Sequence, residues 1–213
     1  MAATTLRLVR DRLAPSRSRT LSAANRVLYV HTGDVTIRHD GLVSGLTADR
    51  AWHGAGECTV IAGPDGALVL RWELAPSAPA GEGEPVLDRT VKLAPDVAWL
   101  MRCDRVDFEP GGVALPHRHR GGGIRCLVAG ELEVRVGDGP SRLVRLGEAW
   151  FESGREPVLA RASATEPTSF VRVAILPAEI RGRSSIIYVD PADAERGRPR
   201  RYTIWVDAPI AVA

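Results

Sequence analysis

The sequence predicts an all-β protein made of many short strands. Eight segments alternate hydrophobic and polar residues with the period of two that is typical of a half-buried strand. Clusters of Gly, Pro and Asp separate these segments and favour turns between them. No segment longer than a turn or two has helical periodicity, and only the first dozen residues are ambiguous. Many short strands with regular turns indicate an antiparallel sandwich or barrel.

The predicted strands divide into two groups along the chain. In order they are RVLYVH (26–31), DVTIRH (34–39), ALVLRWEL (67–74), GIRCLVAG (123–130), ELEVRV (131–136), FVRVAIL (170–176), SIIYV (185–189) and YTIWV (202–206). A stretch rich in Pro, Gly and Ala, APSAPAGEGEP at 75–85, lies between the third strand and the fourth. Because this composition is typical of a linker, we expect a domain on each side of it.

An internal repeat supports this division. RVLYVHTGDVTI (26–37) aligns with GIRCLVAGELEV (123–134), which places Gly33 over Gly130, and AWHGAGECTVIA (51–62) aligns with AWFESGREPVLA (149–160). Two matched blocks in the same order at nearly the same offset indicate a tandem duplication. The expected domains are an N-terminal domain at 1–75, a linker at 76–96, a C-terminal domain at 97–178, and C-terminal strands at 179–213 that pack on the barrels.

Composition places the chain among ordinary globular proteins. Hydrophobic residues make up 45% of its 213 residues, charged residues make up 25%, and the net charge is +2. The arginines are spread among Asp and Glu, apart from the run RGRPRR at 196–201, which we interpret as a solvated loop. A concentrated basic face is missing, so we expect no nucleic-acid partner.

The cysteines and the N-terminus indicate where the protein is located. Cys58, Cys103 and Cys126 are odd in number and lack CxxC spacing, which argues against a disulfide framework or a structural zinc site. The N-terminus lacks the apolar region of a secretion signal, and no stretch approaches the ~18 continuous apolar residues of a membrane span. We therefore expect a cytoplasmic protein that does not enter the membrane.

Two histidines one residue apart mark the candidate site. His117 and His119 lie in PGGVALPHRHRGGGIRCLVAGEL at 110–132. This stretch resembles the first motif of the cupin superfamily, which runs Gly, five residues, His-x-His, three or four residues, Glu, six residues, Gly. Gly111, the two histidines and Gly130 match the motif, whereas its glutamate position falls on Gly123.

The remainder of the resemblance is less complete. A second motif begins at Gly147, but the position of its histidine falls on Val158. In the first copy, the positions of the histidine pair and the glutamate are occupied by Thr20, Ser22 and Arg26. The resemblance implies a bicupin, with two tandem double-stranded β-helix (jelly-roll) barrels and a site in the C-terminal barrel alone. It also implies a homodimer.

Strand geometry adds a prediction about the site itself. Residues two apart in a strand face the same side, so His117 and His119 project together and can share one divalent ion, Fe, Mn, Zn or Ni. By the same alternation Arg125 enters the same cavity. A buried guanidinium suits the carboxylate of an anionic small-molecule ligand, although pairing with an internal carboxylate is equally compatible with the pattern.

Glu152 is the candidate that completes the ligand set. It precedes the turn of the second motif, and with the two histidines it would form a facial triad of two His and one carboxylate, typical of non-haem iron sites. Alternatively, Glu152 is a solvated residue at a strand end. Water or a ligand carboxylate would then complete the metal's ligand shell.

Three functions fit these residues. The first is a metal-dependent enzyme, such as a dioxygenase, acting on a small carboxylate that Arg125 orients. The second is a cupin that binds or senses a small ligand without catalysis, because the glutamate and histidine positions are vacant. The third is a metal-free isomerase or epimerase, which needs a tyrosine near His117, and the chain has Tyr29, Tyr188 and Tyr202. The sequence leaves both catalytic and non-catalytic functions open.

Overall fold

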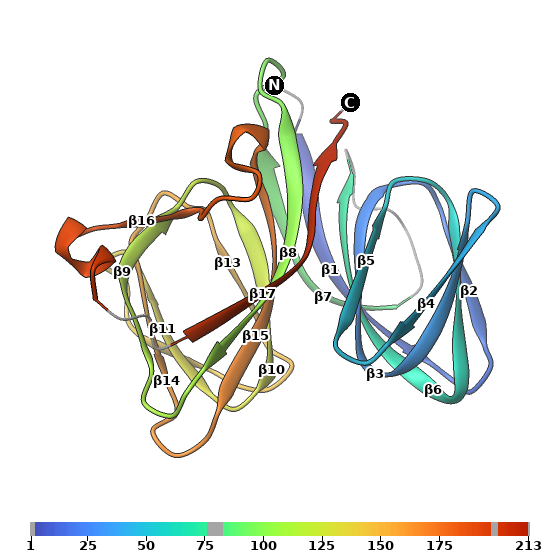
Figure 1. Ribbon diagram of the computed structural model, residues 1–213, viewed down its shortest axis with the longest axis horizontal. Coiled ribbons are helices and arrows are strands. Elements are labelled where there is room, and N and C mark those ends of the chain that lie inside the picture. Colours follow the sequence, from blue (N-terminus) through green and yellow to red (C-terminus); the bar gives the residue numbers. More distant parts are fainter. Residues whose placement is uncertain (1–2, 76–82, 197–199, 213) are drawn as a thin grey trace. The chain divides into compact units, whose positions relative to one another are not determined.

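The computed structural model describes residues 3–75, 83–196 and 200–212 and is almost entirely β. Within these residues the helical elements are two short 3-10 turns, η1 (Ala178–Ile180) and η2 (Pro191–Ala194), so the all-β prediction is confirmed. No helix in the described part of the chain has the length and apolar character needed to cross a membrane. The chain forms two compact units, Met1–Val97 with Ile210–Ala213, and Ala98–Pro209 (Figure 1).

The C-terminal unit consists of two five-stranded antiparallel sheets. Its strands are β8 (Trp99–Phe108), β9 (Val113–His119), β10 (Gly123–Ala129), β11 (Leu132–Val136), β12 (Arg142–Val144), β13 (Ala149–Glu152), β14 (Val158–Ala162), β15 (Thr168–Pro177), β16 (Ile186–Tyr188) and β17 (Arg200–Ile210). One sheet has the order β13-β10-β15-β8-β17 and the other the order β12-β11-β14-β9-β16. From β8 to β11, and again from β12 to β15, successive strands lie in alternate sheets, which is the strand order of a jelly roll.

The core of this unit lies between the two sheets. Alternate residues of its strands point inward and form one hydrophobic cluster, whose buried members are Val106, Phe108, Ala114, Leu127, Leu132, Val134, Val144, Trp150, Val158, Ala160 and Phe170. Gly130 makes the corner between β10 and β11 with φ of 67°, and a Cβ there would lie 2.6 Å from the carbonyl oxygen of Pro167. Glycine is therefore required where the chain passes from one sheet to the other.

The N-terminal unit has a similar strand arrangement, but its long strands join all of it into one sheet. Its strands are β1 (Ala3–Leu13), β2 (Ser18–Leu21), β3 (Asn25–His39), β4 (Leu42–Thr47), β5 (Arg50–Gly54), β6 (Cys58–Ala75) and β7 (Glu84–Lys92), joined in one sheet. The long strand β3 pairs with β5 in its first half and with β4 in its second half, and the register shifts between the halves. β6 likewise pairs with β2 at its start and with β1 at its end. Bulges of this kind let a strand bend around a barrel.

The two units share a pairing order. The order β5-β3-β6-β1 in the first unit corresponds to β13-β10-β15-β8 in the second, and β4-β3-β6-β2 corresponds to β12-β11-β14-β9. Gly33, which the sequence repeat aligns with Gly130, also has a positive φ, 77°. The shared order and the shared corner glycine are what a tandem duplication predicts.

The structure shows a strand within the predicted linker and locates the C-terminal strands. Within the linker expected at 76–96, Glu84–Lys92 forms the edge strand β7, which pairs with β1, while 76–82 lie outside the described residues. Pro85 lacks an amide hydrogen, and an edge strand tolerates this because one of its sides has no partner. The strands expected at 179–213 extend the two sheets of the C-terminal unit, β16 beside β9 and β17 beside β8.

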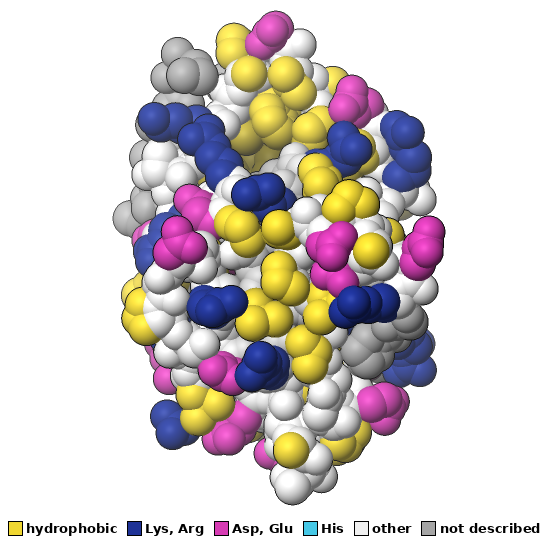
Figure 2. Space-filling view, turned by 90° about the vertical axis from the view of Figure 1, so that its left-hand side faces the viewer, with side chains coloured by type: hydrophobic (Ala, Val, Ile, Leu, Met, Phe, Trp, Pro, Cys, Tyr) yellow, Lys and Arg dark blue, Asp and Glu magenta, His cyan; other side chains and the backbone are white. Residues whose placement is uncertain are grey.

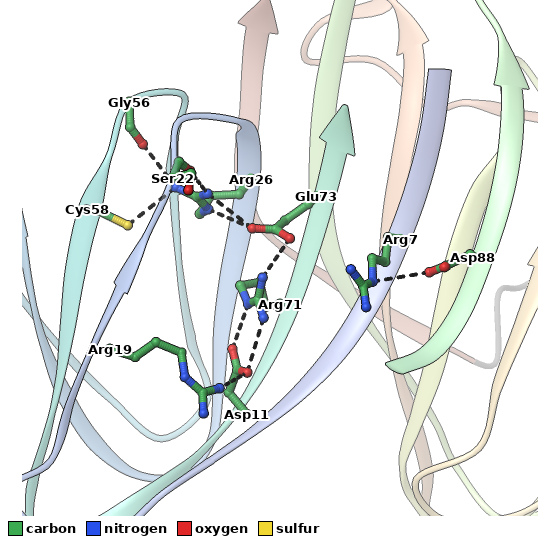
Figure 3. Close-up of polar contacts among 10 residues, drawn as sticks. All are labelled: Arg7, Asp11, Arg19, Ser22, Arg26, Gly56, Cys58, Arg71, Glu73 and Asp88. Carbon is green, nitrogen blue, oxygen red and sulfur yellow. Dashed lines mark hydrogen bonds and ion pairs between the residues drawn. The ribbon is translucent and has the colours of Figure 1, made fainter. Parts of the chain in front are cut away.

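Charged side chains fill one end of the interior of the N-terminal unit (Figure 3). Arg71 lies between two carboxylates, with Nε 2.7 Å from Oδ2 of Asp11 and Nη1 2.6 Å from Oε2 of Glu73. Glu73 also binds Arg26, whose Nη2 is 3.1 Å from Oε1, and Arg19 contacts Asp11. Four of these side chains, those of Asp11, Arg26, Arg71 and Glu73, are buried, so each charge depends on its neighbours for compensation.

We predict that Glu73→Gln lowers the free energy of unfolding of the N-terminal unit by about 3–5 kcal/mol. The substitution removes the carboxylate that the buried guanidinium groups of Arg26 and Arg71 share. Denaturant unfolding of the full chain measures this effect. Glu57→Gln, at an exposed position of the same unit, is the matched control and should change stability by less than about 0.5 kcal/mol. Equal effects of the two substitutions would contradict the structural importance of the network.

Candidate ligand site in the C-terminal barrel

His117 and His119 lie side by side in the interior of the C-terminal barrel. Both side chains on β9 are buried, and their ring centroids are 4.8 Å apart with the planes nearly perpendicular. They therefore share a face of the strand, as the sequence predicts. Tyr188 pairs with His117 across β16 and β9, and the two ring centroids are 6.4 Å apart.

Burial keeps the two imidazoles neutral. Desolvation lowers the pKa of His117, and it lowers the pKa of His119 to about 3. The Nδ1 atom of His117 lies 2.7 Å from the carbonyl oxygen of Leu115, so Nδ1 carries the proton and Nε2 is left as an acceptor. In His119, Nδ1 lies 3.2 Å from Oγ of Ser185 and Nε2 lies 3.4 Å from Oε2 of Glu152.

Glu152 points into the same cavity and is paired with Arg125. Strand β13 places Glu152 opposite Gly123 of β10, two residues from Arg125. The Nη2 atom of Arg125 lies 2.7 Å from Oε2 of Glu152, and Trp150 Nε1 donates a hydrogen bond of 2.8 Å to Oε1. Of the two partners considered for Arg125, the structure thus supplies the internal carboxylate.

This pairing controls the charges of both groups. Burial by itself would raise the pKa of Glu152, but the Arg125 guanidinium and the contact with His119 hold that pKa well below its usual range. Burial lowers the pKa of Arg125 to about 10, against the opposing effect of the Glu152 charge. At neutral pH both groups are ionised and together carry no net charge.

A second ion pair lies next to the first. Arg172 on β15 pairs across the sheet with Asp104 on β8, and its Nε donates a hydrogen bond of 3.0 Å to Oδ1 of Asp104. Both side chains are buried. The Nη1 atom of Arg172 lies 3.4 Å from Nδ1 of His119, so this guanidinium also contributes positive charge at the histidines.

As it stands, the donor set does not fit a divalent metal ion. Within the described residues, no three His, Cys, Asp or Glu side chains are arranged to hold one. Two imidazoles face the cavity, but the Glu152 oxygen nearest to them is already 2.7 Å from Arg125. Two guanidinium groups close to the histidines would also repel a dication.

Sequence reasoning missed Arg200 and Tyr202, which come from β17. Arg200 belongs to the run that we expected to form a solvated loop, of which 197–199 lie outside the described residues. Instead Arg200 begins β17, its side chain is buried, and its Nε donates a hydrogen bond of 2.5 Å to the Tyr202 hydroxyl. The signal was available: extending the alternation of YTIWV by two residues puts Arg200 on the same face as Tyr202.

These groups surround one small cavity. Its volume is ≈ 20 Å³, which holds about one or two water molecules. The polar side chains that line it are His117, His119, Arg125, Glu152, Arg172, Arg200 and Tyr202. Apolar side chains line the remainder, among them Val158, which occupies the position of the second-motif histidine and pairs with His117. Where the motif has a fourth ligand, this barrel therefore has two methyl groups.

The positions of the N-terminal barrel that match the site hold other residue types with other partners. Arg26, at the position of Gly123, donates hydrogen bonds to the carbonyl oxygens of Ser22 and Gly56 and pairs with Glu73 (Figure 3). Thr20 lies on β2 with its hydroxyl 3.1 Å from that of Thr59. At these positions the side chains of the N-terminal barrel therefore bind other residues of the same barrel.

One face of the molecule carries charges of both signs. Figure 2 shows the face turned to the left in Figure 1, with basic and acidic side chains scattered among hydrophobic ones. No histidine is visible among the coloured residues of this face. The chemistry that the sequence singled out therefore lies inside the barrel.

Comparison with known proteins places the fold. No protein-family model and no curated protein sequence matches the chain. Solved structures do match: a cupin 2 conserved barrel domain protein from Leptotrichia buccalis has a TM-score of 0.53 at 17% identity, covering 82% of this chain and 85% of its own. AerE from Microcystis aeruginosa has a TM-score of 0.62 at 12% identity, covering 81% and 88%. Oxalate decarboxylase from Bacillus subtilis has 0.67 at 13%, covering 91% and 72%. The chain therefore has the cupin jelly-roll fold.

We predict that His119 makes the protein less stable in acid. Its folded pKa is about 3 and its ordinary value is 6.5, so below pH 6.5 the unfolded chain takes up a proton that the folded chain does not. Stability should fall as the pH drops from 6.5 towards 3. In His119→Gln the melting temperature should decline less between pH 7 and pH 4 than in the wild type. Arg118→Gln, an exposed change on the same strand, is the control, and parallel pH profiles for all three proteins would contradict the prediction.

Proposed function

We propose that this protein is a bicupin whose C-terminal barrel binds a small polar molecule and whose N-terminal barrel is structural. This is the second of the three functions considered from the sequence, and it requires no metal. The observation that carries it is a buried donor without a partner at one cavity. Nη2 of Arg200, which lines this cavity, is buried and has no hydrogen-bond partner among the described residues.

Unmatched polar atoms are costly unless a ligand satisfies them. A buried donor or acceptor without a partner costs ≈ 1–3 kcal/mol, and more when it is charged. Arg125 and Glu152 compensate each other's charge at 2.7 Å, so Nη2 of Arg200 is the buried atom of the cavity that lacks a partner. Convergent polar groups in an otherwise apolar pocket are typical of small-molecule sites.

The contrast between the barrels supports the division of roles. In the N-terminal barrel the buried arginines bind carboxylates and backbone carbonyl groups at the positions that match the site. In the C-terminal barrel similar groups surround a cavity instead. Of two units with the same strand order, the matching charged residues bind one another in one unit and line a cavity in the other.

A small-ligand probe tests this function. Formate and its neutral analogue formamide are small enough to serve as probes, and binding of either should shift the NMR signals of the His117 and His119 rings. Ala160→Val places two further methyl carbons at a cavity-lining position and should abolish these shifts. Ala162→Val, on the same strand but outside the cavity lining, should leave them unchanged. If neither probe shifts the ring signals in the wild-type chain, the proposed function is wrong.

A divalent metal site is the second candidate, and one distance favours it. Nε2 of His119 and Oε2 of Glu152 are 3.4 Å apart, which is close to the ~3.4 Å that separates two ligands of a tetrahedral ion at ~2.1 Å. Binding would require Arg125 to release Glu152. A bound iron or similar ion would then supply the chemistry of a dioxygenase acting on a small carboxylate.

Metal analysis distinguishes this candidate. Untagged protein exposed to Fe(II), Mn(II), Zn(II) or Ni(II) and then desalted should retain close to one ion per chain if the site is a metal centre, and His117→Ala should lose it. Arg125→Met frees Glu152 and should increase retention. Metal contents that are negligible, or equal in the wild type and His117→Ala, would eliminate the metal function.

The metal-free isomerase requires a tyrosine near His117. Tyr202 lines the same cavity as His117, and the ring of Tyr188 lies 6.4 Å from that of His117. A tyrosine beside a neutral histidine is the pairing that acid–base catalysis needs. Turnover without added metal that is lost in Tyr202→Phe would favour this candidate over simple binding.

A further inference from the structure

Arg200 is a buried cation without an ionic partner in the described part of the chain. Its side chain, 9% exposed, lies at the start of β17 and lines the cavity. Nε donates to the Tyr202 hydroxyl, and the guanidinium lies 5.7 Å from the centre of the Tyr202 ring. These contacts hold the group in place but leave its charge uncompensated. Nη2 has no hydrogen-bond partner among the residues described.

The other charges of the cavity cancel in pairs. Arg125 faces Glu152, and Arg172 faces Asp104. Three guanidinium groups therefore face two carboxylates, and one positive charge remains at Arg200.

Arginine side chains remain charged in proteins, so this imbalance has to be relieved by an opposite charge. An unpaired charge in a closed site is one of the most costly groups a protein can bury. A carboxylate supplies the missing charge and matches the planar fork of Arg with two parallel hydrogen bonds.

We propose that Arg200 anchors the carboxylate of a small monocarboxylate ligand in the C-terminal barrel. The inference rests on the proposed function and names its ligand class: one negative charge, in a group small enough for a cavity of ≈ 20 Å³. Tyr202 is a positioning residue that holds the guanidinium towards the cavity.

The test compares formate with formamide, which has a similar size and shape but no charge. Both are titrated into the full chain at pH 7 in chloride-free buffer of fixed ionic strength, since chloride is itself a monoanion. NMR of the His117 and His119 rings reports binding. The wild type should bind formate at least tenfold more tightly than formamide.

Substitutions at two neighbouring arginines localise the effect. Arg200→Gln should weaken formate binding at least tenfold and leave formamide binding unchanged, so that the two probes become nearly equivalent. Arg201→Gln, on the same strand with its side chain 80% exposed, should bind formate like the wild type. Arg200→Lys keeps the charge but loses the fork, so it should have an intermediate affinity. It also provides the comparison if Arg200→Gln does not fold.

The outcomes separate this inference from the function on which it rests. If formate and formamide bind equally in the wild type, the ligand class is wrong while small-molecule binding stands. If formate is preferred but Arg200→Gln and Arg200→Lys bind it normally, Arg200 is not the anchor. If neither probe binds the wild type, both the function and its ligand class are overturned.

Discussion

Pairing of buried arginines with carboxylates is the constraint on which the interiors of both barrels depend. A guanidinium remains ionised wherever it is buried, so each one placed inside a barrel requires an opposite charge or several acceptors nearby. The sheets provide this by register: Arg26 lies directly opposite Glu73 on the neighbouring strand, and Arg172 lies opposite Asp104. Strand pairing and charge pairing therefore specify each other, since a shift of one residue would turn one partner to the outer face.

The same constraint has had different results in the two units. In the N-terminal barrel, Arg71 bridges Asp11 and Glu73, and the network extends to Arg26. In the C-terminal barrel the pairs lie around a cavity, and Arg200 enters it from a strand that follows the repeated blocks. The two units thus share a pairing order, and the additional C-terminal strand brings Arg200 and Tyr202 to the cavity of one of them.

Glu152 determines which chemistry the C-terminal barrel can perform. Its Oε2 lies near both Arg125 and His119, so the same oxygen can compensate a guanidinium or contribute to a metal shell. It cannot do both well, because a metal ion at the histidines would lie close to the guanidinium and be repelled by it. The positive charge contributed by Arg125, Arg172 and Arg200 favours an anion over a dication.

The sequence by itself determined the fold class, the strand alternation and the common face of His117, His119 and Arg125, because these follow from the local period of two. It also brought Glu152 to the site through the resemblance. It did not reveal β7, whose Pro85 and charged residues resemble a loop, nor the inward direction of Arg200. Only the tertiary structure decided that Arg125 binds Glu152 and that Arg200 has no carboxylate partner, because both depend on pairing between strands far apart in the chain. Local pattern specifies which face a residue takes, whereas register and barrel closure specify which residue it meets there.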